Sequence, residues 1–303
     1  MTGAGIREGL VVRSTAGFVD VLVDGDHIQA RMRGRLKNKP NRTDLCVIGD
    51  RVHIEEPDES SYVVVEVLPR HSRFSRRQPG RGPMREDVLI ANLDQLLVTF
   101  CYGEPPLKRR LLDRVLVIAE QQHVQATIVI NKSDLAPEEG LPWSELYESL
   151  GYEVLEVSAS TGAGLPKLRK ALEGRISAFV GPSGVGKSSL INQILPELEL
   201  ETANVSQHHG KGRHTTRVAT LHALPSGGFL ADTPGIRELG AWALPGDELD
   251  RCFPELSKLR DRCGFRRCSH VHEPNCAVLA ALERGDIDSE RYDSYVRLRE
   301  EAS

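Results

Sequence analysis

Hydrophobic and polar residues alternate over short distances in the first part of the chain. Five apolar-rich segments predict short β-strands, namely residues 9–14, 17–23, 27–33, 50–56 and 62–68. Five short strands within about 60 residues predict a small β-barrel, which we place in a first domain, residues 1–80. The Pro- and Gly-rich segment 78–83 predicts a linker at the end of this domain.

A different pattern begins at residue 94, where strand-like segments alternate with segments of helical periodicity. The strand-like segments are 94–100, 126–130, 152–159 and 175–180, and the helical ones are 107–122, 143–151, 165–174 and 187–195. This alternation predicts right-handed βαβ units and a mostly parallel sheet. We expect this α/β domain over residues 81–245, followed by a mainly helical domain over residues 246–303.

A phosphate-binding loop is predicted where one of these strands ends. GPSGVGKS fits the pattern G-x-x-x-x-G-K-[ST] and lies between a predicted strand and a predicted helix. Glycines let backbone N–H groups turn towards phosphate oxygens, and a helix N-terminus favours negative charge. Lys187 is expected to reach the β- and γ-phosphates, and Ser188 to bind Mg²⁺. The expected nucleotide contacts are Gly181, Pro182, Ser183, Gly184, Val185, Gly186, Lys187, Ser188 and Ser189.

The choice of base is predicted by NKSD, which follows another apolar strand. The Asp134 carboxylate can accept hydrogen bonds from N1–H and the exocyclic amine of guanine, a pair of donors that adenine lacks. Asn131 is expected to brace this loop and touch the base, and the stem of Lys132 to lie over the ring. Ser158 and Ala159 follow the next strand, and their backbone N–H groups are expected to face the guanine O6.

Two further segments predict the parts that respond to the γ-phosphate. LADTPG (230–235) places Asp232 and Gly235 at the end of an apolar strand, where Asp232 can hold Mg²⁺ through water and the Gly235 N–H can contact the γ-phosphate. The polar, Gly-rich segment 210–217 precedes it. Its Thr215 or Thr216 is the candidate Mg²⁺ ligand, although two β-branched residues are equally typical of the start of a strand.

The order of these motifs is unusual. The guanine reader and the O6 loop come before the phosphate loop, the threonines and D-x-x-G, whereas an ordinary GTP-binding protein has the last three first. A circular permutation explains this order and preserves the site, because each motif stays at the carboxyl end of its own strand. The permutation also leads the chain from D-x-x-G directly into the C-terminal domain.

A metal site is predicted near the C-terminus. Residues 263–276 read CGFRRCSHVHEPNC, and three thiolates with one imidazole suit tetrahedral Zn²⁺. We expect the ligands to be Cys263, Cys268, His270 and Cys276, with His272 as the competing nitrogen ligand; the alternative is a group of reduced, buried cysteines. Four protein ligands leave no open position, so one structural Zn²⁺ would stabilise a small domain. The remaining cysteines at 46, 101 and 252 are expected to be core residues.

Charge distribution adds a candidate partner. The chain has 303 residues and a formal net charge of −4, yet residues 1–81 contain 14 Lys/Arg and 11 Asp/Glu. The runs 31–42 and 69–85 each carry six basic residues and no acid, which is typical of a solvated face or of a nucleic-acid surface. No apolar run is long enough for a transmembrane helix and no signal-peptide pattern is present, so we expect the protein in the cytoplasm. We also expect it to be a monomer.

The whole arrangement resembles the ribosome small subunit-dependent GTPase A (RsgA) family. The resemblance covers nearly the whole chain and rests on NKSD, GPSGVGKSS, GRHTT, DTPG and the Cys/His cluster. It implies an OB-fold barrel, a circularly permuted P-loop GTPase domain and a zinc domain, and it favours His270 as the nitrogen ligand. It also implies GTP/GDP and Mg²⁺ as ligands, the small ribosomal subunit and its rRNA as partners, and late maturation of that subunit as the task.

The group that orients the attacking water is not given by the usual GTPase motif. Many GTPases have a Gln directly after D-x-x-G to orient the attacking water, but here that residue is Ile236. We therefore expect slow hydrolysis by the chain alone, with His214 as the candidate group, a role that the resemblance also implies. Contact of His214 with RNA or solvent is the alternative. A nucleotide-gated RNA-binding module, in which hydrolysis is incidental, remains the alternative function.

Overall fold

The N-terminal part of the computed structural model is a closed five-stranded barrel. The structure describes residues 5–15, 17–33, 46–58, 61–77, 86–136, 142–200, 218–233 and 246–302. The barrel strands are β1 (Arg7–Thr15), β2 (Phe18–Val23), β3 (Asp26–Met32), β4 (Arg51–Asp58) and β5 (Ser61–Val67). They pair in the order β1-β2-β3-β5-β4, and β4 pairs with β1 to close the ring. The five strands predicted from alternation are confirmed.

The central sheet is the mostly parallel one that the sequence predicts. Its strands are β8 (Gln95–Cys101), β9 (Gln125–Asn131), β10 (Glu153–Glu156), β11 (Ile176–Val180), β12 (Thr220–Ala223) and β13 (Phe229–Asp232). They follow the order β10-β9-β8-β11-β13-β12, in which only β12 runs antiparallel to its neighbour β13. All residues of β8 are buried, as expected for a strand covered on both faces.

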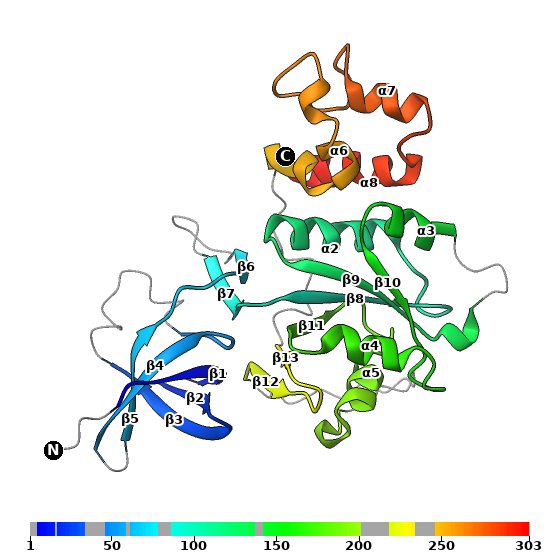
Figure 1. Cartoon of the computed structure of the whole chain (residues 1–303). Helices are drawn as coiled ribbons and strands as arrows, with labels where there is room; N and C mark the ends of the chain where they lie inside the picture. Colours follow the sequence, from blue (N-terminus) through cyan, green and yellow to red (C-terminus); the bar gives the residue numbers. More distant parts are fainter. Residues whose placement is uncertain are drawn as a thin grey trace, which may run out of the picture.

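Helices cover both faces of this sheet (Figure 1). They are α2 (Arg109–Gln121), α3 (Pro142–Ser149), α4 (Leu165–Leu172) and α5 (Lys187–Ile194), with short 3-10 turns η1 (Ser133–Leu135) and η2 (Pro196–Leu198). Side chains of α2 and α3 share one hydrophobic core with the sheet, whereas side chains of α4 and α5 share another on its opposite face. Two separate cores therefore hold the sheet between helical layers and fix the positions of the loops at the strand ends.

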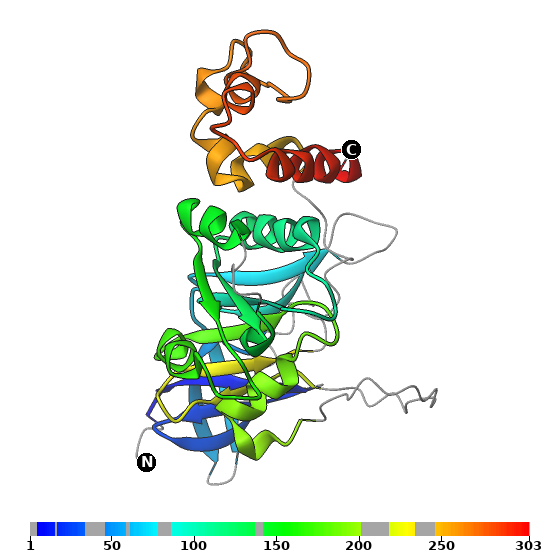
Figure 2. The same cartoon turned by 90° about the vertical axis from the view of Figure 1, so that its right-hand side faces the viewer.

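The C-terminal part is helical and packs on α2. It contains η5 (Gly246–Cys252), α6 (Pro254–Ser257), η6 (Arg260–Arg262), α7 (Ala277–Glu283) and α8 (Ser289–Ala302). Figures 1 and 2 show α2 lying between the sheet and α8. Accordingly, α2 is apolar on two sides, with Leu112 and Leu116 in the core over the sheet and Val117 in the core of the C-terminal part.

A fully buried ion pair also joins these two layers. Arg291 of α8 donates to the Asp113 carboxylate of α2 at 2.5 Å and to Glu255 of α6 at 2.8 Å, and both Arg291 and Asp113 have no exposed side-chain surface. The Tyr147 hydroxyl of α3 donates to the same Asp113 oxygen at 2.5 Å. Because an unpaired buried charge is strongly unfavourable, this network couples the placement of α8 to that of α2 and α3.

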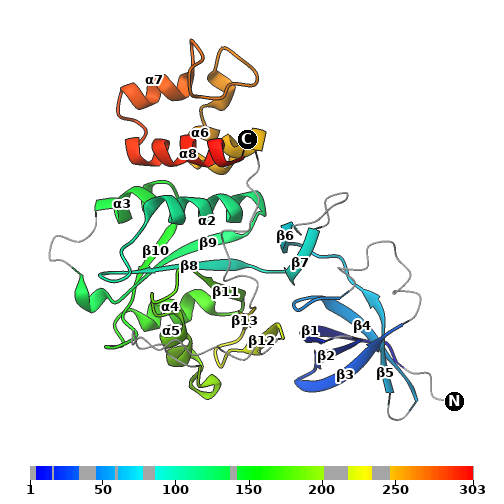
Figure 3. The same cartoon turned by 180° about the vertical axis from the view of Figure 1, so that it is seen from behind.

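Two features near the barrel were not predicted. The strands β6 (Arg73–Arg77) and β7 (Glu86–Ala91) form an antiparallel pair. Residues 78–85 between them, which include the predicted linker 78–83, lie outside the described residues. Figure 3 shows this pair between the barrel and the central sheet. In addition, β1 pairs with β12 at Arg13 and Thr220, so the barrel and the central sheet form one hydrogen-bonded sheet.

In the described part of the chain, no helix is long and apolar enough to cross a membrane.

Candidate nucleotide and metal sites

The predicted nucleotide motifs meet at one edge of the central sheet. Gly181 follows β11, Asn131 ends β9, Ser158 follows β10 closely and Asp232 ends β13. These four strands are parallel, so their carboxyl ends lie on the same edge. The strand order places the guanine-reading loops on one side of the phosphate loop and Asp232 on the other. The reversed order along the chain therefore produces a normal spatial arrangement of the motifs.

The phosphate loop has the backbone geometry that its glycines predict. Gly181, Gly184 and Gly186 have φ angles of 149°, 84° and 89°, a region that favours glycine. The Lys187 ammonium lies against the loop and donates to the carbonyls of Gly181 at 2.8 Å and Pro182 at 2.5 Å. Helix α5 begins at Lys187 with no side-chain cap, so its first N–H groups can face a phosphate.

Asn131 connects three loops of the site. Its side-chain amide donates to the Val185 carbonyl of the phosphate loop at 2.9 Å, and its oxygen accepts from the Ala159 N–H at 3.1 Å. The side chain is buried, and Gly186 approaches it so closely that an added Cβ would lie 2.2 Å from the amide nitrogen. The expectation that Asn131 braces the loop agrees with these contacts. Its direct link to the phosphate loop was not predicted, because sequence spacing does not show which strand ends are neighbours.

Asp134 is held in its charged form. The Ser158 hydroxyl donates to its carboxylate at 2.5 Å, and this hydrogen bond is the largest influence that lowers the pKa of Asp134 below its ordinary value. Lys132 has a left-handed backbone (φ 59°), and its ammonium donates to the Glu104 carbonyl in the loop before α2. Asp134 is exposed and can therefore accept hydrogen bonds from a base at neutral pH.

The predicted O6 donors have partners within the protein. The Ser158 N–H donates to the Ala163 carbonyl at 2.9 Å, and the Ala159 N–H donates to Asn131 as described above. A guanine O6 would have to share the Ala159 donor with Asn131. Ser158 is placed to act through its buried hydroxyl, which holds Asp134, rather than through its N–H.

The magnesium side of the site is described only in part. Ser188 lies in the first turn of α5, and Asp232 ends β13, the strand next to β11. The other predicted residues on this side, His214, Thr215, Thr216, Gly235 and Ile236, lie outside the described residues. Their roles remain predictions.

The four predicted metal ligands come together. The ligand atoms of Cys263, Cys268, His270 and Cys276 all lie within 4.8 Å of one another. The sulfurs of Cys263 and Cys276 are 3.9 Å apart, and His270 Nδ1 lies 3.5 Å and 3.4 Å from them. Tetrahedral Zn²⁺, with bonds of about 2.3 Å to sulfur and about 2.0 Å to nitrogen, requires separations of about 3.8 Å and about 3.5 Å. The donor set therefore fits a zinc ion, and the competing His272 is exposed and not part of the cluster.

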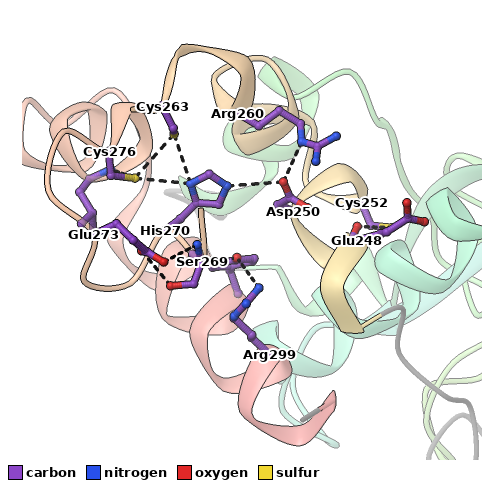
Figure 4. A network of polar contacts seen from close by, with 12 residues as sticks. Glu248, Asp250, Cys252, Arg260, Cys263, Ser269, His270, Glu273, Cys276 and Arg299 are labelled. Carbon is purple, nitrogen blue, oxygen red and sulfur yellow. Dashed lines mark hydrogen bonds and ion pairs between the residues drawn. The ribbon is translucent and has the colours of Figure 1, made fainter. Parts of the chain in front are cut away.

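A carboxylate behind the imidazole was missed by the sequence reasoning. His270 Nε2 faces the Asp250 carboxylate at 3.4 Å, and Arg260 donates to the same oxygen at 2.8 Å (Figure 4). Burial alone would raise the pKa of Asp250, but the hydrogen bonds and charges of His270 and Arg260 outweigh it and lower the pKa. Such a carboxylate orients a metal-binding histidine, here leaving Nδ1 for the metal. Asp250 lies 20 residues from His270 in a stretch with no motif, so no sequence signal pointed to it.

This chain has the architecture of a circularly permuted P-loop GTPase. A barrel precedes the nucleotide domain, whose motifs follow one another in permuted order, and a helical module comes after it. A family model described as RsgA GTPase matches residues 67–242, and one described as RsgA N-terminal domain matches residues 8–63. The chain belongs to the RsgA GTPase family. The resemblance noted from the motifs is thereby confirmed, and the family implies GTP and GDP as ligands together with Mg²⁺.

Relatives and solved structures match over nearly the whole chain. A Gemmatimonas aurantiaca protein named small ribosomal subunit biogenesis GTPase RsgA is 46% identical over 97% of this chain and 96% of its own. One of the same name from Moorella thermoacetica is 41% identical over 95% of each chain. The structure of YjeQ from Thermotoga maritima superposes with a TM-score of 0.78 at 33% identity, covering 98% of this chain and 99% of that one. YloQ, described as a circularly permuted GTPase, gives 0.76 at 30% identity, covering 98% and 95%.

Proposed function

We propose that this chain hydrolyses GTP while bound to the small ribosomal subunit and assists the late maturation of that subunit in the cytoplasm. The observation that carries the proposal is the pair of relatives bearing the name small ribosomal subunit biogenesis GTPase, which align over at least 95% of the chain. The nucleotide edge supports it, because the guanine-reading loops and the phosphate loop are linked there through Asn131.

The nucleotide is proposed to lie across that edge. Lys187 and the N–H groups of residues 181–189 would hold the phosphates, while Asp134 and Asn131 would read guanine. Ser188, Asp232 and either Thr215 or Thr216 would hold Mg²⁺, which neutralises charge that develops on the phosphates. The chain itself contributes positioning, since phosphoryl transfer depends mainly on alignment and charge stabilisation.

Hydrolysis is proposed to depend on the subunit. Ile236 follows D-x-x-G and cannot hydrogen-bond a water, so another group must orient it. We assign this role to His214, which the subunit would bring towards the attacking water by a shift of population between conformations. His214→Ala should keep nucleotide affinity and subunit binding and lose most of the stimulated turnover. If the variant keeps the stimulated rate, the catalytic group lies elsewhere in the chain or in the subunit.

The flanking parts are proposed to act as separate modules, residues 1–80 as an rRNA-binding barrel and residues 246–303 as a zinc module. The basic runs 31–42 and 69–85 support rRNA contact through the barrel. The cluster of three thiols and His270, whose ligand atoms lie within 4.8 Å of one another, supports one structural Zn²⁺. We propose that the chain works as a monomer, with GTPase residues 81–245 between the two modules.

The deciding experiment compares GTP turnover by the purified chain with and without small ribosomal subunits. The proposal predicts a slow rate alone and a large increase with small subunits, but not with large subunits at the same concentration. An unchanged rate with subunits that nevertheless bind in a GTP-dependent manner would instead indicate a nucleotide-gated RNA-binding module.

A further inference from the structure

A positively charged cleft lies between α2 and α8, apart from the barrel and from the nucleotide loops. Its volume is about 630 Å³. Five cationic side chains line it, together with the carboxylates of Asp293 and Glu301, and the cations are Lys108, Arg109, Arg110, Arg114 and Arg297. Figures 1 and 2 both show α8 lying along α2 at this seam. The excess of cations on the walls favours an anionic ligand.

Most of these cations already have carboxylate partners. Arg109 pairs with Asp288 at 2.9 Å and Glu290 at 2.5 Å, Arg114 pairs with Glu301, and Arg297 pairs with Asp293 at 2.7 Å. Lys108 and Arg110 are exposed, and no partner of either is found among the described residues. The five cations are matched by four carboxylates, two of them on Arg109, so the cleft keeps a net charge of +1, which suits a ligand with one negative charge near Lys108 and Arg110.

The start of α2 also favours an anionic ligand. Lys108 is the N-cap residue and makes no side-chain cap, and the first turn contains no acidic residue. A helix N-terminus carries partial positive charge, so cationic side chains there are disfavoured and an anion is favoured. The helix N-terminus and the two unpaired cations thus favour the same kind of ligand.

Helix α2, one wall of the cleft, follows a loop that contacts the guanine reader. The loop that leads into α2 contains Glu104, whose carbonyl accepts from Lys132 of the guanine reader. A ligand bound at the start of α2 would therefore lie next to the end of this loop.

We propose that this cleft binds the phosphodiester backbone of RNA, with Lys108 and Arg110 as the contacting cations. This inference rests on the proposed function, because it takes the small subunit as the source of the RNA. One charge per phosphodiester matches two unpaired cations in an open cleft, whereas a free polyphosphate would require several unpaired cations in an enclosed site. The cleft then acts as a third RNA contact that joins the GTPase helix α2 to the zinc module.

The test measures binding of the full chain to purified small ribosomal subunits as a function of salt. Lys108→Gln/Arg110→Gln should flatten the slope of log K against log salt by about 1.5, since each lost phosphate contact removes somewhat less than one unit. The matched control is Lys167→Gln/Lys170→Gln, which removes the same charge from exposed positions on α4, on the opposite face of the sheet. The control should keep the wild-type slope, and both variants should bind GDP as the wild type does.

Equal slopes for the wild type and the cleft variant would overturn the inference while leaving the proposed function intact. A wild-type chain that does not bind small subunits would overturn both. A second arm uses inorganic phosphate at about 10 mM, because a ligand that binds the folded state raises the Tm. If it raises the Tm of the wild type but not of the cleft variant, and the slopes remain equal, the cleft takes a small phosphate compound and the RNA assignment is wrong.

Discussion

Gly186→Ala tests whether Asn131 makes the phosphate loop and the guanine loops into one unit. The substitution places a Cβ 2.2 Å from the Asn131 amide nitrogen, in a residue whose φ is 89°. The backbone alone costs about 1–2 kcal/mol for a non-glycine residue. Displacing Asn131 also breaks its hydrogen bonds to Val185 and Ala159, each worth about 0.5–1.5 kcal/mol. The sum is about 2–5 kcal/mol. If all of it opposes nucleotide binding, the affinity falls by roughly 30- to 4,000-fold.

The assay is a titration with a fluorescent GDP analogue, accompanied by thermal unfolding. Gly184→Ala is the matched control, because its φ is similar at 84° but its Cβ would meet only Pro105, at an ordinary 3.4 Å. It should show the backbone cost alone. In an Asn131→Ala background the clash is removed, so Gly186→Ala should then cost no more than Gly184→Ala. If Gly186→Ala costs the same in both backgrounds, Asn131 does not couple the two loops.

Other predictions concern the C-terminal module. Arg291→Ala leaves the Asp113 carboxylate buried without its partner and should lower the free energy of unfolding by about 3–5 kcal/mol in a denaturant titration. Arg284→Ala, which breaks an exposed ion pair, should cost less than about 1 kcal/mol; equal effects would contradict the buried network. Burial raises the pKa of the Cys268 thiol to about 12, so zinc must displace the thiol proton when it binds. As the pH is lowered, zinc affinity should therefore fall about tenfold per pH unit for each proton displaced. Chelator competition at two pH values checks this, and a pH-independent affinity would contradict it. In the same assay Asp250→Asn should weaken zinc binding by about 10- to 100-fold, and wild-type affinity would exclude its orienting role.

The sequence predicts those parts of the molecule that depend on local pattern. The barrel strands follow from alternation of side chains, and the phosphate loop follows from glycines whose φ angles only glycine adopts easily. The metal ligands lie within fourteen residues, so their spacing alone brings them together. The nitrogen ligand needed the family resemblance to choose between His270 and His272, and the structure places only His270 in the cluster.

Contacts between distant segments could not be predicted in this way. Asn131 meets the phosphate loop 54 residues away because β9 and β11 lie on either side of β8, and no spacing rule expresses that order. Arg291 reaches Asp113 across 178 residues because α2 is apolar on two sides, which a single helical stripe does not show. The pair β6 and β7 was missed because a basic, polar strand lacks the alternation that marks a half-buried one.

The central claim is that the rearranged motifs form a guanine-nucleotide site, and the base specificity of Asp134→Asn tests it most directly. Xanthine has a carbonyl where guanine has its exocyclic amine, so an amide at residue 134 can donate to it, whereas the carboxylate accepts from guanine. Titration with GDP and with xanthosine diphosphate should show a wild type that prefers GDP and a variant that prefers the xanthine nucleotide. A variant that folds, binds nucleotide and keeps its preference for guanine would show that Asp134 does not read the base.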